Sequence, residues 1–251
     1  MTTQNEGDLK LLQASYRGLR DEASVAFVDE AYRLHSECRS NEQPFYALAA
    51  VVLTVSIHDV ARTDLRNIVE GDWWHTVEAQ QSLQGRRRIQ AMTEYLAAYK
   101  DPCVLSVQHT PQTHESPKEM RAASLSALLA AVGGNMQPPA GITLPETDMI
   151  VFEKQQHRAD TQRDLHTLKG ARAAGHIDRH YRAHHVSPAI EPLLWLPDLV
   201  SHTYRRYITH GEQLVTLLSE QTITVDATQK KSDPLEAAAY IQGVSRLSLT
   251  P

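Results

Sequence analysis

Three acidic residues in this chain have positions that suit a metal site. Asp29 ends a short apolar run, Glu153 directly follows another, and Asp198 lies in the first turn of a predicted helix. Carboxylates held close together repel one another unless a cation neutralises them. Oxygen ligands suit Mg²⁺ or Mn²⁺, and a pair of such ions can activate water for phosphodiester hydrolysis. If folding brings the three acids together, they predict divalent-metal chemistry, with Glu30 as a reserve ligand.

Each acid also has an ordinary structural explanation. Asp29 and Glu30 are compatible with a strand that ends in solvent, and Glu153 with the opening of a loop. The helix dipole alone favours Asp198 in a first turn. The metal-site interpretation therefore depends on the three positions jointly, and on elements that would bring them to one place.

Arginines near these acids are candidates for contacting phosphate. Arg205 lies seven residues after Asp198, on roughly the same face of a helix, and is the preferred contact. Arg206 beside it, and Arg86 in the run Arg86–Arg88, are further candidates for substrate binding. Neutralised phosphates would make binding sensitive to salt. The alternative is that these arginines are solvated surface.

Histidines and tryptophans offer further candidates. His157 and His202 each follow a candidate acid by four residues, so either could transfer protons or simply share a helix face with that acid. The adjacent Trp73 and Trp74 could stack on bases or pack in the core.

A group of histidines raises the possibility of zinc. His176, His180 and His184 are spaced by four residues and are followed by His185. On a helix the first three would share a face that could hold Zn²⁺. If residues 181–186 form a strand, that face does not exist, and a polar surface is the simpler explanation.

The pattern of apolar residues predicts strands that alternate with helices. Strands are expected at residues 24–29, 45–55, 103–107 and 148–152, with a weaker one at 181–186. Helices are expected at residues 64–69, 73–99 with a break near Gly85, 116–132, 160–174 and 197–207, the last with an extension toward 218. Ser116 begins its helix with a capping box, since Pro117 suits the first turn and Glu119 lies three positions on.

This order predicts an α/β fold in which helices flank a mixed sheet. The first two strands lack a convincing helix between them and indicate an antiparallel pair, whereas later strands alternate with helices and imply parallel neighbours. An RNase H-like sheet has this mixture, and its adjacent first and fourth strands would place Asp29 near Glu153. We expect residues 1–20 to be an N-terminal extension, 21–220 an RNase H-like domain, and 221–251 a C-terminal tail with at most a short helix around 235–242.

Composition narrows the class of protein. The 251 residues carry a formal net charge of −5, so no global basic field indicates nucleic acid, although a local basic strip remains open. Two cysteines make no disulfide framework, the polar N-terminus has no secretory pattern, and the longest apolar run is too short to span a membrane. We therefore expect a cytoplasmic protein without membrane contacts. Motifs of P-loop, nicotinamide-dependent and serine hydrolase enzymes are not found in the sequence.

Short motifs along the chain resemble a known family. The run Ala26–Glu30 (AFVDE), the apolar strand from Phe45 to Val55 and the run Leu196–Val200 (LPDLV) are similar to motifs of the domain-of-unknown-function family numbered 3800. The resemblance covers roughly residues 24–208. It implies an RNase H-like fold and a metal-dependent nuclease, in which Asp29 and Asp198 match the motif acids and Glu153 stands where an aspartate often ends the fourth strand.

Some positions depart from that family's pattern, and two functions follow. Ala31 stands where the family usually has serine, and Trp195 and Pro197 stand where glutamine and alanine are usual. The leading hypothesis is a Mg²⁺- or Mn²⁺-dependent nuclease, or a related phosphoryl-transfer enzyme, that acts on DNA or RNA. The alternative is a catalytically degenerate module on the same fold, which binds nucleic acid or a protein partner.

Overall fold

Two long antiparallel strands form the centre of the fold. β1 (Ser24–Arg33) and β2 (Phe45–Thr54) pair along their whole length, from Ser24 opposite Thr54 to Arg33 opposite Phe45. Their side chains are mostly apolar and buried, as expected for strands that are covered on both faces. The structure, a computed structural model, describes residues 3–39, 42–109, 116–155, 157–228 and 244–246.

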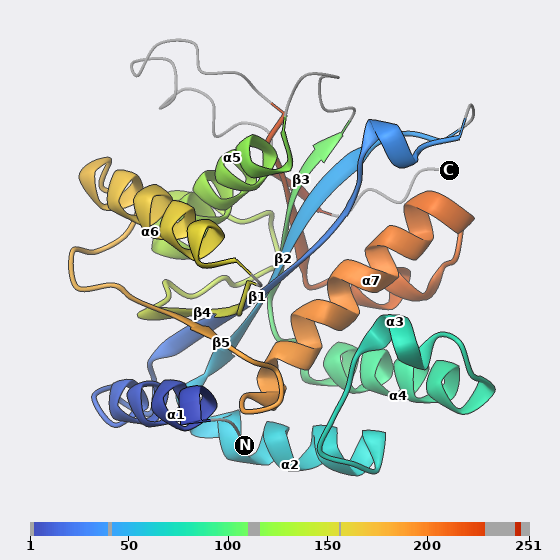
Figure 1. Cartoon of the computed structure of the whole chain (residues 1–251), viewed down its shortest axis with the longest axis horizontal. Coiled ribbons are helices and arrows are strands. Elements are labelled where there is room, and N and C mark those ends of the chain that lie inside the picture. Colours follow the sequence, from blue (N-terminus) through green and yellow to red (C-terminus); the bar gives the residue numbers. More distant parts are fainter. Residues whose placement is uncertain (1–2, 40–41, 110–115, 156, 229–243, 247–251) are drawn as a thin grey trace.

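Five further strands extend this pair into one mixed sheet (Figure 1). Over the described residues the order across the sheet is β5-β4-β1-β2-β3-β6-β7. β3 (Cys103–His109) is antiparallel to β2, whereas β4 (Met149–Glu153) is parallel to β1 and β5 (Arg182–Val186) is parallel to β4. β6 (Thr222–Asp226) pairs parallel with β3, and β7 (Val244–Arg246) pairs antiparallel with β6. The order and directions of β5-β4-β1-β2-β3 are those of an RNase H-like sheet, which confirms the predicted fold class.

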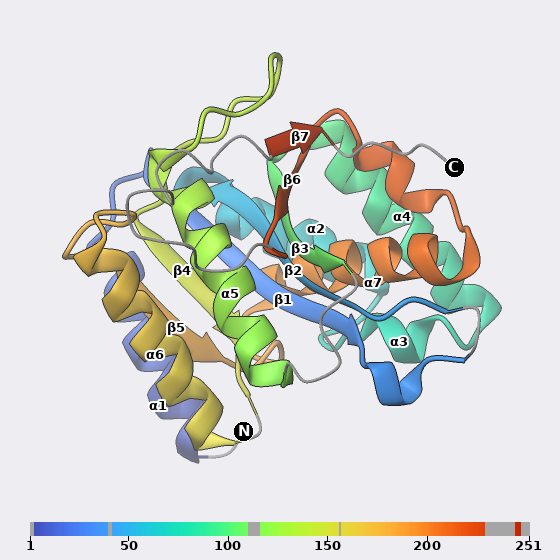
Figure 2. The same cartoon turned by 90° about the horizontal axis from the view of Figure 1, so that it is seen from above.

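Helices cover both faces of the sheet, as Figure 2 shows from above. The helices are α1 (Thr3–Tyr16), α2 (His58–Val69), α3 (Thr76–Ala79), α4 (Leu83–Tyr99), α5 (Pro117–Ala130), α6 (Arg158–Ala173) and α7 (Trp195–His210). Short 3-10 turns lie at His35–Glu37, Val55–Ile57, Pro192–Leu194 and Leu214–Leu218, and a π turn at Ala131–Asn135. α5 and α6 pack on one face, whereas α2, α4 and α7 pack on the other. None of the described helices is long and apolar enough to span a bilayer.

The start of α5 confirms the predicted capping box. The Glu119 carboxylate accepts a hydrogen bond from the Ser116 backbone N–H at 2.8 Å, and the Ser116 hydroxyl accepts one from the Glu119 N–H at 3.3 Å. These two bonds satisfy backbone donors that the first turn would otherwise leave unpaired.

Side chains alternate across β1 and divide the core into two layers. Val25 and Phe27 belong to the layer beneath α7, whereas Ala26 and Val28 belong to the layer beneath α5 and α6. Because successive residues of a strand point to opposite faces, Asp29 follows on the α7 side. Its neighbour Glu30 follows on the α5 side.

The fold extends beyond both predicted domain boundaries. Leu12 of α1 is buried in the core, and the Tyr16 hydroxyl donates to Glu191 at 3.0 Å. Arg62 binds the same Glu191 carboxylate through hydrogen bonds of 2.9 and 2.8 Å. α1 is therefore part of the packed body, and β6 lies beyond residue 220, where the tail was expected to begin. The short helix expected at 235–242 lies outside the described residues.

The long helix predicted at 73–99 is two helices, but its break is not at Gly85. α3 ends at Ala79 and α4 begins at Leu83, where the Ser82 hydroxyl accepts a hydrogen bond from the Gly85 N–H at 2.9 Å. Gly85 lies inside α4 because α3 packs directly against it. A Cβ at this position would lie 1.9 Å from the Ala79 carbonyl oxygen.

Two glycine-to-alanine substitutions should therefore have opposite effects. Gly85→Ala should lower the free energy of unfolding by about 1–3 kcal/mol, because its Cβ overpacks against backbone. Gly170→Ala in α6 should raise it by about 0.5–1 kcal/mol, because nothing lies within 4 Å of the added Cβ and alanine is the better helix former. Urea unfolding of both variants measures the difference, and equal effects would contradict the packing of α3 on α4.

Candidate functional site

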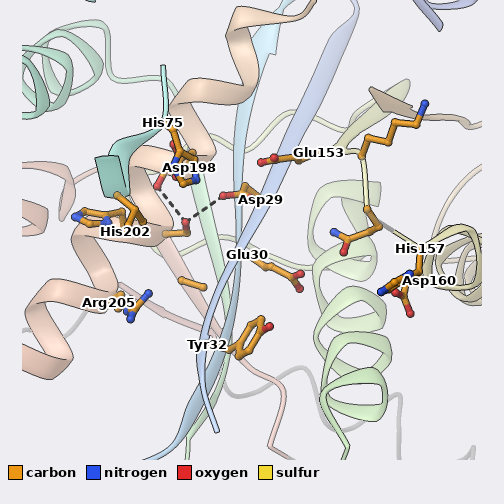
Figure 3. Close-up of a pocket in the computed structure, with 15 residues that line it drawn as sticks. Asp29, Glu30, Tyr32, His75, Glu153, His157, Asp160, Asp198, His202 and Arg205 are labelled. Atoms are coloured by element: carbon orange, nitrogen blue, oxygen red, sulfur yellow. Dashed lines mark hydrogen bonds between the residues drawn. The ribbon is translucent and has the colours of Figure 1, made fainter. Parts of the chain in front are cut away.

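Three elements bring the predicted acids to one cavity (Figure 3). Asp29 comes from β1, Glu153 from the end of β4 and Asp198 from the first turn of α7. All three line a cavity of about 550 Å³. The predicted convergence of the three side chains is therefore present in the fold.

Strand register explains why Asp29 and Glu153 meet. β1 and β4 run in parallel, and Val28 pairs with Phe152, so the next residue of each strand is one of the two acids. β4 ends at Glu153, whereas β1 continues to Arg33 and does not end at Asp29 as predicted. Beyond the end of β4, none of the described strands pairs with that side of β1, and the cavity opens there.

A chain of hydrogen bonds holds Asp198. The Thr76 backbone N–H and hydroxyl donate to Asp198 Oδ2 at 2.9 and 2.8 Å. The buried Trp74 indole N–H donates in turn to the Thr76 hydroxyl at 2.8 Å. Trp74 is thus a core residue that positions the acid, and Trp73, with 53% of its surface exposed, is not among the residues that line the cavity.

Burial raises the pKa of all three acids, and repulsion from neighbouring carboxylates raises the pKa of Asp29 and Glu153 further. For Asp29, burial is the largest cause, and the charges of Asp198 and Glu153 add to it. For Glu153, burial and Asp198 raise the pKa, while a hydrogen bond with Asp29 and the nearby His75 oppose them. Burial also raises the pKa of Asp198, against the hydrogen bonds from Thr76.

The negative charge of the three acids is largely uncompensated by the basic side chains around them. Within the described part of the chain, neither Asp29, Glu153 nor Asp198 forms an ion pair with lysine, arginine or histidine. Lys154 also lines the cavity but pairs with Asp8 of α1 at 2.5 Å. The acids therefore repel one another in a partly buried place, the situation that a bound cation relieves.

The donor set suits a hard cation in its chemistry. Carboxylate oxygens are the ligands that Mg²⁺ and Mn²⁺ prefer, and Asp198 keeps its Oδ1 free of the bonds from Thr76. In their present rotamers, however, no three His, Cys, Asp or Glu side chains among the described residues are grouped closely enough to hold a metal ion. Binding an ion would require the carboxylates to turn toward one another.

Glu30, expected as a reserve ligand, is occupied elsewhere. Its carboxylate accepts a hydrogen bond from Arg121 of α5 at 2.6 Å and another from the Tyr46 hydroxyl. It borders the cavity, but it belongs to the opposite face of β1 from Asp29. The difference follows from strand alternation, because adjacent acids on a strand cannot point to the same side.

The three arginines predicted to contact phosphate lie in different surroundings. Arg205 lines the cavity, and no hydrogen bond or ion pair is found for its guanidinium among the described residues. Arg206 is bound to Glu212, and Arg86 lies on the exposed side of α4, where it donates to the Gln80 carbonyl at 3.1 Å. Only Arg205 of the three predicted arginines is placed to meet a ligand in this cavity.

Several histidines also border the cavity. His157, His202 and His75 line it, and His75 is the residue that the sequence did not single out as a site residue. No local pattern in the sequence marks it, because its place in the cavity depends on the non-local hydrogen bonds from the next residue, Thr76, to Asp198. Burial lowers the pKa of His202 to about 4, so this side chain is neutral near neutral pH.

The histidines considered for zinc do not share a helix face. His184 and His185 lie in β5, where His184 contacts the Ser15 hydroxyl at 2.9 Å and His185 contacts Asp164 at 2.9 Å. His180 instead accepts a hydrogen bond from Arg179 at 3.0 Å. Because residues 182–186 form a strand, the four-residue spacing of these histidines does not bring them onto one face of a helix.

Comparison with known proteins found no family model, curated protein or solved structure that matches this chain. The site is therefore interpreted from its own geometry and electrostatics.

Neutralising one acid should stabilise the protein in a chelator. Raised pKa values mean that the folded state holds the protons of these acids more tightly, so the stability that they contribute is fully present below the unfolded-state pKa and is lost as pH rises through the folded pKa. Asp29→Asn should therefore raise the free energy of unfolding near neutral pH by about 1 kcal/mol or more. The gain should vanish below about pH 4, where the unfolded carboxyl is also protonated.

The matched control is Asp72→Asn, whose side chain is 94% exposed and which should change stability by less than about 0.5 kcal/mol. Denaturant unfolding across the pH range provides the measurement. A loss of stability in Asp29→Asn near neutral pH would contradict uncompensated repulsion among the acids.

Proposed function

We propose that this chain is a Mg²⁺- or Mn²⁺-dependent nuclease, or a related phosphoryl-transfer enzyme, that acts on DNA or RNA. The observation that carries the proposal is the meeting of Asp29, Glu153 and Asp198, from three separate elements, in one cavity where none of them forms an ion pair with a described basic side chain. The RNase H-like order of strands supports it. Because a fold alone does not fix a function, the acids carry the argument.

The three acids, Arg205 and the neighbouring Thr76 have separate roles in this proposal. Asp29, Glu153 and Asp198 would hold the metal, which when bound would supply an activated water and stabilise the charge on the leaving oxygen. Thr76 keeps Asp198 in place. Arg205 would hold a phosphate of the substrate, since a guanidinium matches phosphate geometry through paired hydrogen bonds.

The proposed location is the cytoplasm. Cys38 and Cys103 are both free thiols, which is the usual state in a reducing compartment.

A second candidate function is a non-catalytic binding module. Asp198 Oδ2 already accepts two hydrogen bonds from Thr76, and this arrangement suits a structural carboxylate as well as a ligand. Such a module would bind its partner in the same cavity without needing a metal. Binding that persists unchanged in a chelator and in Asp198→Asn favours this second candidate.

Removing any one acid should abolish metal-dependent cleavage. We expect Asp29→Asn, Glu153→Gln and Asp198→Asn each to lower the cleavage rate at least about 100-fold, because several kcal/mol of transition-state stabilisation depend on the bound ion. The assay uses labelled single- and double-stranded DNA and RNA with Mn²⁺, with Mg²⁺ and with a chelator. Asp72→Asn serves as the control that should cleave at the wild-type rate. Cleavage that survives the chelator, or all three substitutions, would contradict the proposal.

Arg205 should account for one phosphate contact. In Arg205→Ala, the slope of log binding constant against log salt should become shallower by about 0.7–0.9, the value for one phosphate contact. Arg87→Ala, on the exposed side of α4, should leave the slope unchanged. Equal slopes in wild type and Arg205→Ala would show that this side chain meets no phosphate.

A further inference from the structure

One wall of the cavity is an exposed tyrosine ring. Tyr32 lies near the end of β1, beyond the end of β4, with 38% of its surface exposed, and it lines the same cavity as the three acids. One side of its ring stacks on Tyr46 of β2, with ring centroids 5.6 Å apart and planes inclined by 8°. Tyr46 itself is only 1% exposed, so Tyr32, which is labelled in Figure 3, is the outer ring of a two-ring stack.

Buried ionic contacts hold this stack in place. The Tyr46 hydroxyl donates to Glu30, and Arg121 donates to the same carboxylate at 2.6 Å. Arg121 also binds Asp164 through two hydrogen bonds of 2.8 Å, and His185 contacts Asp164 at 2.9 Å. The network joins β1, β2 and β5 to α5 and α6 on one face of the sheet, so the ring beneath Tyr32 is held by contacts from several elements.

A fixed aromatic face beside a phosphate-binding group suits a nucleobase. Base-on-aromatic stacking tolerates any base, because every base has a π-face. In a duplex those faces are covered by neighbouring base pairs, whereas an unpaired base can turn one toward a protein. Arg205 and the three acids lie in the same cavity as Tyr32, so phosphate and base of one strand could be bound together.

From this geometry we propose that the substrate is single-stranded nucleic acid, or an unpaired segment, with one base stacked on Tyr32. This inference rests on the proposed function and names its substrate class. Trp73 and Trp74, the aromatic pair that the sequence offered as a stacking platform, are not among the residues that line the cavity. The network around Glu30 thereby has a use distinct from metal binding, because it supports the ring that meets the base.

Binding of short strands to matched variants tests the stacking. Fluorescence anisotropy would compare a labelled single strand, its blunt duplex and an abasic strand of equal length, all with Asp29→Asn protein so that the strand stays intact. Tyr32→Leu keeps an apolar side chain but loses the ring, and should weaken single-strand binding about 5- to 150-fold, the range for one stacked base. Tyr32→Phe keeps the ring and should restore binding. Tyr99→Leu removes an exposed ring on α4, which is 55% exposed, and controls for non-specific losses.

The possible outcomes distinguish a failure of the stacking inference from a failure of the proposed function. The stacking inference predicts that Tyr32→Leu also loses the preference for a normal strand over an abasic one. Three results would overturn stacking while leaving metal-dependent cleavage intact. In the first, Tyr32→Leu binds the single strand as tightly as the Asp29→Asn protein in which it is made. In the others, Tyr32→Phe loses as much affinity as Tyr32→Leu, or the duplex binds more tightly than the single strand. If the Asp29→Asn protein binds none of the strands and the wild-type protein neither binds nor cleaves them, both proposals are overturned.

Discussion

The parallel pairing of β1 with β4 is the constraint on which the candidate site depends. Val28 lies opposite Phe152, so Asp29 and Glu153 emerge side by side where β4 ends. A slip of one residue in this register would send one acid to the opposite face of the sheet. The long ladder between β1 and β2 holds β1 in place while β4 ends, so the cavity opens beside a strand that remains rigid.

The two adjacent acids of β1, Asp29 and Glu30, point to opposite faces of the sheet and have surroundings of opposite charge. On the α5 side, Glu30 forms an ion pair with Arg121, which also binds Asp164. On the α7 side, Asp29 meets Glu153 and Asp198, and burial together with like charges raises its pKa. Buried charges normally have partners. The unpaired cluster is therefore unfavourable in the protein alone, and this unfavourable energy is what a bound cation would relieve.

The sequence predicted the fold class and the convergence of the three acids from local patterns. The runs before Asp29 and Glu153 are apolar enough to be buried strands, and the position of Asp198 after Pro197 is typical of a first turn. The ion pair of Glu30 with Arg121 could not be predicted, because the two residues lie ninety-one positions apart and no local pattern links them. The same holds for Thr76, whose bond to Asp198 depends on the packing of α3 on α7. β6 was missed because Thr222–Asp226 is short, and its pairing with β3 is non-local.

Calorimetric titration of Mn²⁺ into metal-stripped protein tests the central claim that the three acids form a cation site. The titration would be run in two buffers of different ionisation enthalpy, for wild type and Asp198→Asn, with and without a short single strand. We predict one or two bound ions in wild type, with release of protons that grows as pH falls, because the raised pKa values leave protons on the acids for the ion to displace. Asp198→Asn should bind much more weakly. No binding at millimolar Mn²⁺ in either condition, or equal binding by both proteins, would contradict the account.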